Sequence, residues 1–208
     1  MKTSLVAIFF LSLVLMGCNN RPATETAIIV QDTSDAYDNT PRNYYEEVML
    51  EDDIVYYSLH YFSDSLAGDS FVVEMPAGNI IGGSYFVRIY NAAGKCVFTD
   101  SVATYHVFNS ISTERDSVTE EQLLAMLDRY LADVVSNGHF SEAGKVEAIK
   151  NAGASDIRNM IGWNEAVADP AMPVFTYDIQ GGTAQICYSH KLNRPVIIVQ
   201  TYDEYEGD

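Results

Sequence analysis

The chain has 208 residues, of which 48% are hydrophobic and 12% aromatic, so it carries enough apolar material for a packed domain and is neither fibrous nor wholly disordered. Its 12 Lys and Arg stand against 29 Asp and Glu, which gives a formal charge of −17 at pH 7. A chain this acidic repels phosphate backbones, and the composition therefore argues against nucleic-acid binding.

The N-terminus has the anatomy of an export signal. Lys2 supplies a positive charge, an apolar run covers Leu5–Met16, and Gly17 precedes Cys18. A helix needs about 20 apolar residues to cross a bilayer core of about 30 Å, so this run is too short for a permanent span. We expect residues 1–17 to be a signal peptide that is removed.

The sequence Leu15-Met16-Gly17-Cys18 resembles the lipobox of bacterial lipoproteins, in which signal peptidase II cleaves before a cysteine that has been diacylglycerated. The resemblance covers only the signal and implies that Cys18 carries a lipid anchor. Each CH₂ of such an anchor that enters the membrane contributes about 0.8 kcal/mol to binding. The alternatives are a secreted protein with a free Cys18 or a buried apolar helix.

The residue after the cysteine, Asn19, stands where the inner-membrane retention signal of many Gram-negative lipoproteins has aspartate. The resemblance therefore implies the outer membrane of a Gram-negative envelope. Residues 19–26 contain one glutamate and no acidic cluster of the kind that exports some lipoproteins to the cell surface. We expect the protein to face the periplasm.

Residues 18–43 are rich in Thr, Asp, Asn, Pro and Ala, and they predict a flexible tether because few apolar groups are available to offset the entropy lost on ordering. As a coil, a tether of about 25 residues would average roughly 25 to 30 Å from end to end. The one apolar patch in it, Ala27–Val30, could pair as an edge strand. Residues 44–208 are predicted to form a single domain.

The first half of this domain reads as strands. Aromatic and β-branched residues are dense over 54–62, and a second strand over 70–75 ends before Pro76. Strands at 85–90 and 96–101 flank an Asn- and Gly-containing turn, which is typical of a hairpin. In that hairpin, alternation places Val87 and Ile89 on one face and Phe86, Arg88 and Tyr90 on the other.

The middle of the domain changes to helical periodicity. A capping box at Thr119–Gln122 and leucines at helical spacing predict an amphipathic helix over 120–136. Shorter helices are expected over 141–151 and 155–168. The helices thus follow the strands of the first half.

The C-terminal part returns to strands at 174–179, 184–189 and 195–202, with a Gly181-Gly182 turn between the first two. The stretch 196–199 is apolar at every position, so we expect it to be a central or fully covered strand. The pattern predicts an α+β fold in the order strands, helices, strands, with one antiparallel sheet and two or three helices packed on one face.

Two cysteines remain in the domain if Cys18 is acylated. Cys96 and Cys187 both lie in predicted strands, and an oxidising envelope would permit one disulfide between them. The alternative is a pair of free thiols that behave as small hydrophobic side chains.

No catalytic, metal-binding or cofactor-binding motif is visible. The sequence has no Gly-x-Ser-x-Gly elbow, no phosphate loop and no HExxH or CxxC spacing, and the four histidines are scattered. The acidic groups lack the alternating ligand order of a calcium loop, which favours a solvated acidic surface. A hydrolase is therefore the third and least favoured alternative, and neither a metal nor a cofactor is expected.

The one compositional feature with functional content is the set of 14 tyrosines. Tyrosine suits faces that bind sugars, peptides or proteins, although it suits any half-exposed sheet equally well. The tyrosines of the first strands are the candidates for contact with a ligand: Tyr56, Tyr57, Tyr61, Tyr85 and Tyr90. Alternation places Tyr57 and Tyr61 on one face and Tyr56 on the other.

These observations favour an envelope lipoprotein that is attached to the membrane by its lipid and acts as a non-catalytic binding or scaffolding module for another envelope protein. The alternative is an accessory lipoprotein that binds a glycan or a peptide. Beyond the lipobox, the chain resembles small uncharacterised envelope lipoproteins only in outline.

Overall fold

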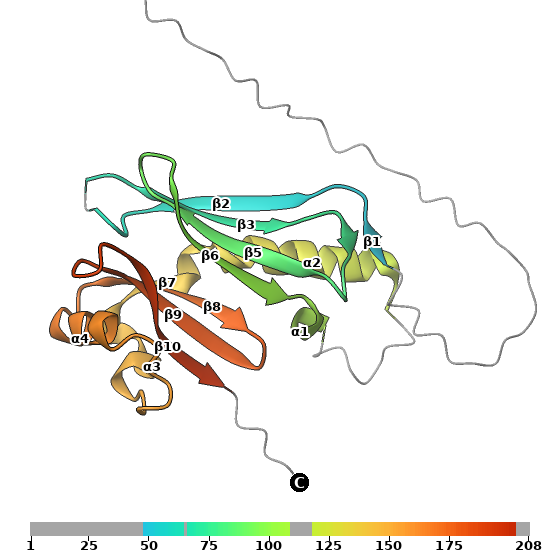
Figure 1. Ribbon diagram of the computed structural model, residues 1–208. Coiled ribbons are helices and arrows are strands. Elements are labelled where there is room, and N and C mark those ends of the chain that lie inside the picture. Colours follow the sequence, from blue (N-terminus) through green and yellow to red (C-terminus); the bar gives the residue numbers. More distant parts are fainter. Residues whose placement is uncertain (1–47, 65, 109–117, 203–208) are drawn as a thin grey trace, which may run out of the picture. The chain divides into compact units, whose positions relative to one another are not determined.

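The computed structural model describes residues 48–64, 66–108 and 118–202, which belong to a compact unit spanning Arg42–Asp208 (Figure 1). The expected signal peptide, the lipidation residue Cys18 and the tether lie outside the described residues. The described part is a mixed α+β structure with antiparallel sheets, as the sequence predicts. Its strands form two four-stranded sheets and one two-stranded sheet, and the single sheet expected from the sequence is wrong.

The first sheet is built from the first half of the domain. Its strands are β2 (Ile54–His60), β3 (Asp69–Met75), β5 (Ser84–Tyr90) and β6 (Cys96–Ala103), which pair in that spatial order. All four were predicted from their β-branched and aromatic residues and the turns that flank them. The short strands β1 (Met49–Leu50) and β4 (Gly78–Asn79) pair with each other.

The predicted hairpin joins β5 to β6. Asn91 closes the turn by accepting hydrogen bonds from the backbone of Ala93 and Lys95 through its side chain, at 3.1 and 3.0 Å. Gly94 has φ of +75°, a left-handed conformation that glycine adopts without steric cost. The turn chemistry read from the sequence is therefore the chemistry that the structure uses.

Helix α2 (Glu120–Val134) covers the inner face of the first sheet, and α1 (Tyr105–Phe108) precedes it. The Thr119 side chain accepts a hydrogen bond from the Gln122 backbone, and the Gln122 side chain accepts one from the Thr119 backbone, which completes the predicted capping box. The buried face of α2 carries Leu123, Leu127, Leu131 and Val134. This stripe closes the larger of the two hydrophobic cores.

The segment after α2 differs from the predicted helix over 141–151. It contains a 3₁₀ turn at Asn137–His139, strand β7 (Phe140–Glu142), a second 3₁₀ turn at Ala143–Lys145 and one short helix, α3 (Glu147–Lys150). Strand β7 pairs with β8, so its backbone groups enter a sheet ladder and are not available to a helix. Tertiary pairing thus overrides the local helical pattern.

The last helix, α4, covers Met160–Ala168 and begins later than predicted. The Asn159 side chain caps it by accepting a hydrogen bond from the Gly162 backbone at 2.9 Å. Residues 156–158 run instead along the edge of strand β10, where Arg158 donates to Ile198 and Gln200 donates to Asp156, each at 2.9 Å. The predicted helix is present, but it begins later because residues 156–158 are hydrogen-bonded to β10.

The second sheet contains β8 (Pro173–Ile179), β9 (Gly182–Ser189) and β10 (Arg194–Tyr202) in the order β10-β9-β8-β7. Strand β10 is an edge strand, so of the two expected placements, a central strand or a fully covered one, it has the second. Ile197 packs against the core shared with the first sheet and Ile198 lies in the core on the other face, while an isolated bridge joins Ile157 to Val199 along the outer edge. Burial of both faces explains its apolar stretch.

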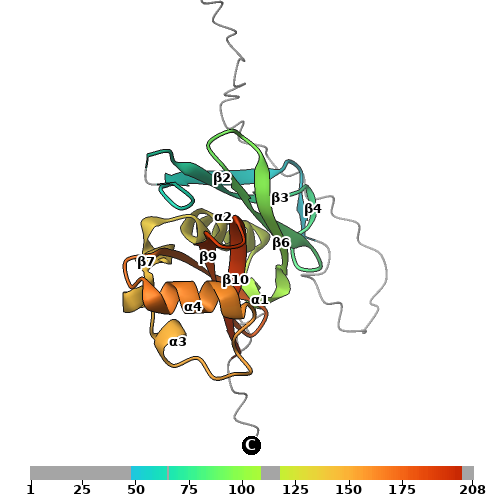
Figure 2. The same cartoon turned by 60° about the vertical axis from the view of Figure 1, so that its left-hand side comes forward.

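Two cores hold the unit together. The larger contains the inner face of the first sheet, α2 and one face of the second sheet, through residues such as Phe71, Leu127 and Phe175. The smaller lies on the other face of the second sheet, where α3 and α4 pack through Ile149 and Ala166 (Figure 2). As a result, the second sheet is covered on both faces, while the first is covered by α2 on one face only.

Candidate functional site

The uncovered face of the first sheet carries a row of exposed apolar side chains, and we call it the outer face. On strand β2, every second side chain points into solvent: Val55 is 54% exposed, Tyr57 71% and Leu59 67%, and Tyr61 just beyond the strand is 65% exposed. Soluble proteins rarely leave such a row of large apolar side chains in water without a function. The row therefore marks a candidate binding surface.

The strand register extends this row across the sheet. Tyr57 pairs with Val72 on β3, and Val72 pairs with Arg88 on β5. In the same way, Val55 is aligned with Glu74 and Phe86, and Leu59 is aligned with Ser70 and Tyr90. The outer face consists of Val55, Tyr57, Leu59, Tyr61, Ser70, Val72, Glu74, Phe86, Arg88 and Tyr90.

The middle of the outer face is electrically neutral. Arg88 forms an ion pair with Glu74, and its guanidinium carbon lies 4.9 Å from the centre of the Phe86 ring. Both charged side chains are about three-quarters buried, at 25% and 29% exposure. The pair thus neutralises the centre and holds Phe86 in place by a cation–π contact.

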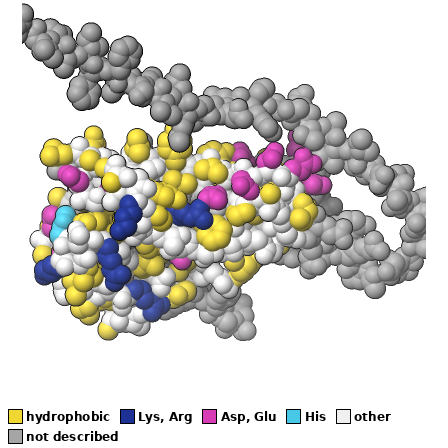
Figure 3. All heavy atoms as spheres, turned by 45° about the horizontal axis from the view of Figure 1, so that its top comes forward, with side chains coloured by type: hydrophobic (Ala, Val, Ile, Leu, Met, Phe, Trp, Pro, Cys, Tyr) yellow, Lys and Arg dark blue, Asp and Glu magenta, His cyan; other side chains and the backbone are white. Residues whose placement is uncertain are grey.

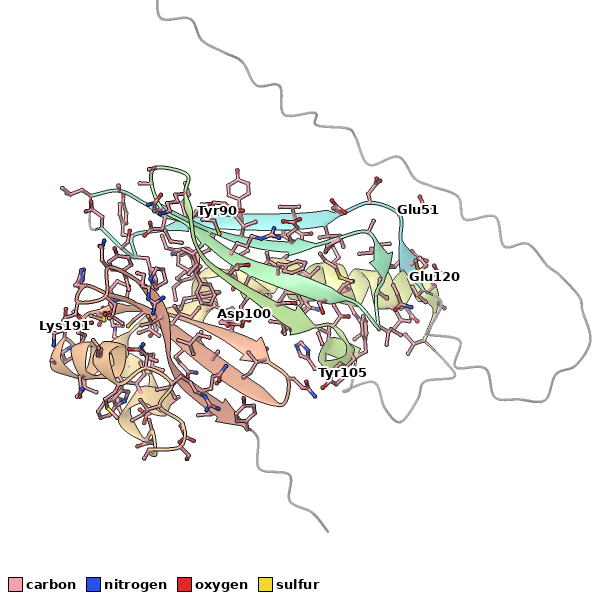
Figure 4. The ribbon with its side chains drawn as sticks, viewed as in Figure 1. Glu51, Tyr90, Asp100, Tyr105, Glu120 and Lys191 are labelled. Atoms are coloured by element: carbon pink, nitrogen blue, oxygen red, sulfur yellow. The ribbon has the colours of Figure 1, made fainter. Side chains whose placement is uncertain are left out.

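The charge lies at one end of the outer face. Glu51, Asp52 and Asp53 are exposed and immediately precede β2, at the end of the sheet opposite Tyr90 (Figure 4). Figure 3 shows apolar side chains spread over this side of the molecule, with acidic ones gathered toward one end. An apolar centre beside an acidic rim is a common anatomy for a surface that binds a protein.

Three of the five tyrosines proposed from the sequence lie on the outer face. Tyr57 and Tyr61 share it as predicted, and Tyr90 joins them from β5. Tyr56 points to the inner side, where its hydroxyl donates to Asp128 of α2 at 2.6 Å. This hydrogen bond, together with burial, raises the pKa of Tyr56 to about 12. Tyr56 therefore anchors α2 to the sheet and is not free to bind a ligand.

The prediction that Tyr85 contacts a ligand is wrong, because its side chain is 0% exposed. Its hydroxyl lies 3.1 Å from that of Tyr130 on α2 and donates to the backbone oxygen of Asp178 at 3.4 Å. Nε2 of His106 lies 3.1 Å from the Tyr130 hydroxyl. Burial raises the pKa of both tyrosines, so they stay neutral and serve as hydrogen-bonding groups inside the core.

Sequence reasoning missed the aliphatic half of the outer face. Val55, Leu59 and Val72 were not singled out, although Val55 and Leu59 have the same alternation as Tyr57 and Tyr61. The same rule shows why Tyr85 was misjudged, since it shares its side of the strand with the buried Val87. Strand parity was therefore readable, but the covered side could be identified only from α2.

Two solvent-facing hollows have the size of small-ligand sites, with volumes of about 640 and 660 Å³. The first lies between β6 and the β8–β9 hairpin, where Asp100 already accepts a hydrogen bond from Tyr177 at 2.5 Å. The second lies beside α2 and contains Asp133 and Ser136. A deep pocket that holds both a histidine and a carboxylate would favour an enzyme. His60 lines neither hollow.

A serine, an aspartate and a histidine meet at the edge of the second hollow, but not in the order of a hydrolase triad. Ser136 donates to Asp133 at 3.1 Å, and His139 contacts the other carboxylate oxygen of Asp133 at 3.3 Å. The histidine hydrogen bond lowers the pKa of Asp133. In a catalytic triad the histidine stands between the other two residues and takes the serine proton. Here Asp133 stands between them, so His139 is not placed to take the Ser136 proton.

His60 has a packing environment. Its ring stacks on Phe140 and meets the edge of Phe71. Burial lowers its pKa, and its Nε2 is buried without a hydrogen-bond partner in the described part of the protein. His60 therefore behaves as a neutral aromatic side chain between the two sheets.

Cys96 and Cys187 do not form the possible disulfide in this structure, and both thiols are free. Cys96 is exposed at the start of β6, whereas Cys187 is buried in the second sheet, where its sulfur contacts the Gly162 backbone oxygen at 3.8 Å. Burial raises the pKa of the Cys187 thiol to about 12. The two cysteines lie in different sheets, which is the reason they do not meet.

Among the described residues, no three His, Cys, Asp or Glu side chains gather as metal ligands. None of the helices described between residues 48 and 202 is both long and apolar enough to cross a membrane. Comparison with known proteins finds no matching family model, curated sequence or solved structure. The sequence and the outer face are therefore the features from which a function can be inferred.

Proposed function

We propose that this protein is a lipid-anchored binding module of the Gram-negative envelope, attached through Cys18 and facing the periplasm from the outer membrane. The Leu15–Cys18 lipobox and the following Asn19 support the anchor and its location. The observation that carries the binding function is the outer face, an open sheet surface on which Tyr57, Leu59 and their neighbours are exposed.

The chemistry of the outer face favours a protein as partner. Tyrosine, phenylalanine and arginine are enriched in protein interfaces, and here they surround a neutralised ion pair. The acidic residues 51–53 at one end fit a partner that carries basic groups around an apolar centre. The helix α2 packs on the opposite face, so binding needs no rearrangement of the core.

A glycan is the second candidate, and the exposed rings of Tyr57 and Tyr61, with the half-buried ring of Tyr90 on the same face, favour it. Sugars stack on aromatic rings but also need hydrogen bonds to their hydroxyl groups. Val55, Leu59 and Val72 offer none, and Arg88 and Glu74 already bond to each other. The aliphatic part of the outer face therefore speaks for a protein over a glycan.

Labelling with a fatty acid tests the anchor. In cells that make the full chain, labelled fatty acid should enter the wild-type protein, and Cys18→Ala should abolish the incorporation because the thiol is the acylated group. The mature wild-type protein should begin at residue 18. Label that persists in Cys18→Ala, or a mature N-terminus far from this residue, would contradict the anchor.

Photo-cross-linking in intact cells tests the outer face. A photo-reactive phenylalanine analogue at Tyr90 preserves an aromatic side chain and should form a protein adduct. The matched control places the same analogue at Val167, which is 50% exposed on α4, away from the outer face. Adding Phe86→Asp to the first variant should weaken the adduct, because it puts a charge at the centre of the surface.

Three outcomes are informative. A protein adduct at Tyr90 that is absent at Val167 and reduced by Phe86→Asp supports the proposal. An adduct that a glycan-degrading enzyme removes assigns the surface to a glycan instead. Equal cross-linking at both positions would mean that the outer face has no special partner.

A further inference from the structure

Strand β2 leaves one edge of the first sheet without a partner strand. It pairs with β3 on one side, and within the described residues no backbone hydrogen bond crosses its other side. Its seven residues contain no proline, no bulge, and no lysine, arginine, aspartate or glutamate. Such an edge is a template for pairing with another strand, and proteins normally block it.

The other edges of the two four-stranded sheets are protected against pairing with a further strand. Residues 156–158 hydrogen-bond along β10, and β7 has only three residues. Strand β6 has a register shift near Tyr90, contacts β10, and accepts a hydrogen bond at Asp100 from Tyr177 of β8. Within the described chain, β2 is therefore the long, regular edge that carries no protection.

We propose that two copies of this chain associate through antiparallel pairing of their β2 strands, with the two-fold axis at Tyr57. Tyr57 of one copy then faces Tyr57 of the other, and Val55 of each faces Leu59 of the other. A two-fold contact must be self-complementary. The exposed sequence aliphatic, aromatic, aliphatic at Val55, Tyr57 and Leu59 reads the same in both directions and meets this requirement.

The charge distribution favours the same arrangement. Each copy carries a formal charge of −17, so the repulsion between two copies is smallest when the residues in their contact are uncharged. In the proposed register Asp53 lies beside Tyr61 of the other copy. The two Asp53 residues are then about 27 Å apart, eight residues at about 3.4 Å each, which exceeds the Debye length of about 8 Å at physiological salt.

Other pairings fit the positions of these charges less well. A parallel pairing would place each of Glu51, Asp52 and Asp53 next to its own copy. An antiparallel pairing centred on Tyr56 would set Leu59 opposite Asp53. The acidic residues before β2 thus select against these registers, and the apolar row selects for the proposed one.

Association in the plane of the sheet leaves the outer face open. The two first sheets join into one sheet of eight strands, four from each copy. Val55, Tyr57 and Leu59 of both copies then lie in the middle of a surface twice as wide. This inference is independent of which partner occupies the outer face.

Cysteine cross-linking tests the register in the full chain, anchored in its membrane. Cys96→Ser removes the exposed thiol, and Tyr57→Cys then places a thiol at the proposed axis. Facing residues of an antiparallel pair have Cα atoms about 4.5 to 5.5 Å apart, within the range of about 4.4 to 6.8 Å that a disulfide requires. Mild oxidation should therefore give a disulfide-linked dimer of the chain.

Two matched variants in the same background are controls. Val55→Cys should not link to itself, because the two copies of residue 55 are about 14 Å apart, but it should link to Leu59→Cys when both are made together. Val72→Cys, on the same face but on β3, should not link. Tyr57→Lys places two like charges at the axis and should lower the association constant roughly tenfold, measured from the monomer fraction in mild detergent.

The proposal is overturned by any of three results: cross-linking of Tyr57→Cys no stronger than that of Val72→Cys, self-linking of Val55→Cys as strong as that of Tyr57→Cys, or an adduct with a different protein in place of the dimer. Circular dichroism and proteolysis of Tyr57→Cys establish that the variant is folded, so a negative result counts. The adduct at Tyr90 does not depend on β2 pairing, so the two proposals fail separately.

Discussion

Gly162 is the point at which helix α4 comes closest to strand β10, and its replacement by alanine tests the packing of the smaller core. A Cβ atom at residue 162 would lie 2.7 Å from Cγ2 of Val196 and 2.8 Å from Cγ2 of Ile198. Carbon atoms in favourable contact are about 3.5 to 4.0 Å apart. Both neighbours are β-branched and stiff at χ1, so α4 must move away from the sheet to admit the methyl group.

Two opposing effects set the magnitude. An extra methyl group in a packed core costs about 1 to 3 kcal/mol, and overlap with two stiff γ-methyl groups points to the upper half of that range. Alanine is at most about 1 kcal/mol better than glycine within a helix. We therefore expect Gly162→Ala to lower the free energy of unfolding by about 1 to 2 kcal/mol and Tm by roughly 2 to 8 °C.

Urea denaturation measures this change, with Gly138→Ala as the matched control. A Cβ at Gly138 would meet only Ser136 Oγ, at 3.5 Å, and its φ is not positive, so that variant should stay within about 0.5 kcal/mol of wild type. Val196→Ala removes the nearest methyl group, so the double variant with Gly162→Ala should lose less stability than the sum of the two single variants. Strict additivity, or a Gly162→Ala variant as stable as Gly138→Ala, would refute the proposed close approach.

Three further predictions follow from burial and pKa. Leu127 is fully buried, so Leu127→Ala should lower the free energy of unfolding by about 3 to 5 kcal/mol in denaturation experiments. Its neighbour Met126 is 37% exposed, so Met126→Ala should lower it by less than about 1 kcal/mol. Equal losses would contradict the orientation of α2. Because burial lowers the pKa of His60, the unfolded chain binds its proton first, and stability should fall as the pH drops below about 6.5. His60→Phe should be less sensitive than wild type between about pH 7 and pH 5, and identical pH profiles would count against burial of the ring. A thiol reagent followed by peptide mass spectrometry should label Cys96 in the native protein and Cys187 only after denaturation, since the buried thiol has a pKa of about 12; native labelling of both would contradict its burial.

Much of the fold followed from local sequence patterns. The hairpin of β5 and β6 depends on Asn91 and Gly94, and α2 depends on its Thr119 cap, all of which act within a few residues. The alternation that placed Val87 and Arg88 on opposite faces is likewise a property of a single strand. These features need no knowledge of the rest of the chain.

The candidate site was only partly readable. Alternation paired Tyr57 with Tyr61 correctly, but it could not show which side of β2 is covered, because this depends on α2, some 70 residues away, and on the hydrogen bond from Tyr56 to Asp128. The same uncertainty made Tyr85 look like a surface residue. The aliphatic row through Val72 became visible only when the register joined three strands.

The sequence by itself determined the strands that carry the outer face, the helix that packs beneath it and the lipobox that predicts the anchor. The tertiary structure decided that the strands divide into two sheets, that β7 replaces part of a predicted helix, and that Cys96 and Cys187 are apart. The physical reason is the range of the interactions: caps, turns and alternation act between near neighbours in the chain, whereas strand pairing and burial join residues that the sequence separates by tens of positions.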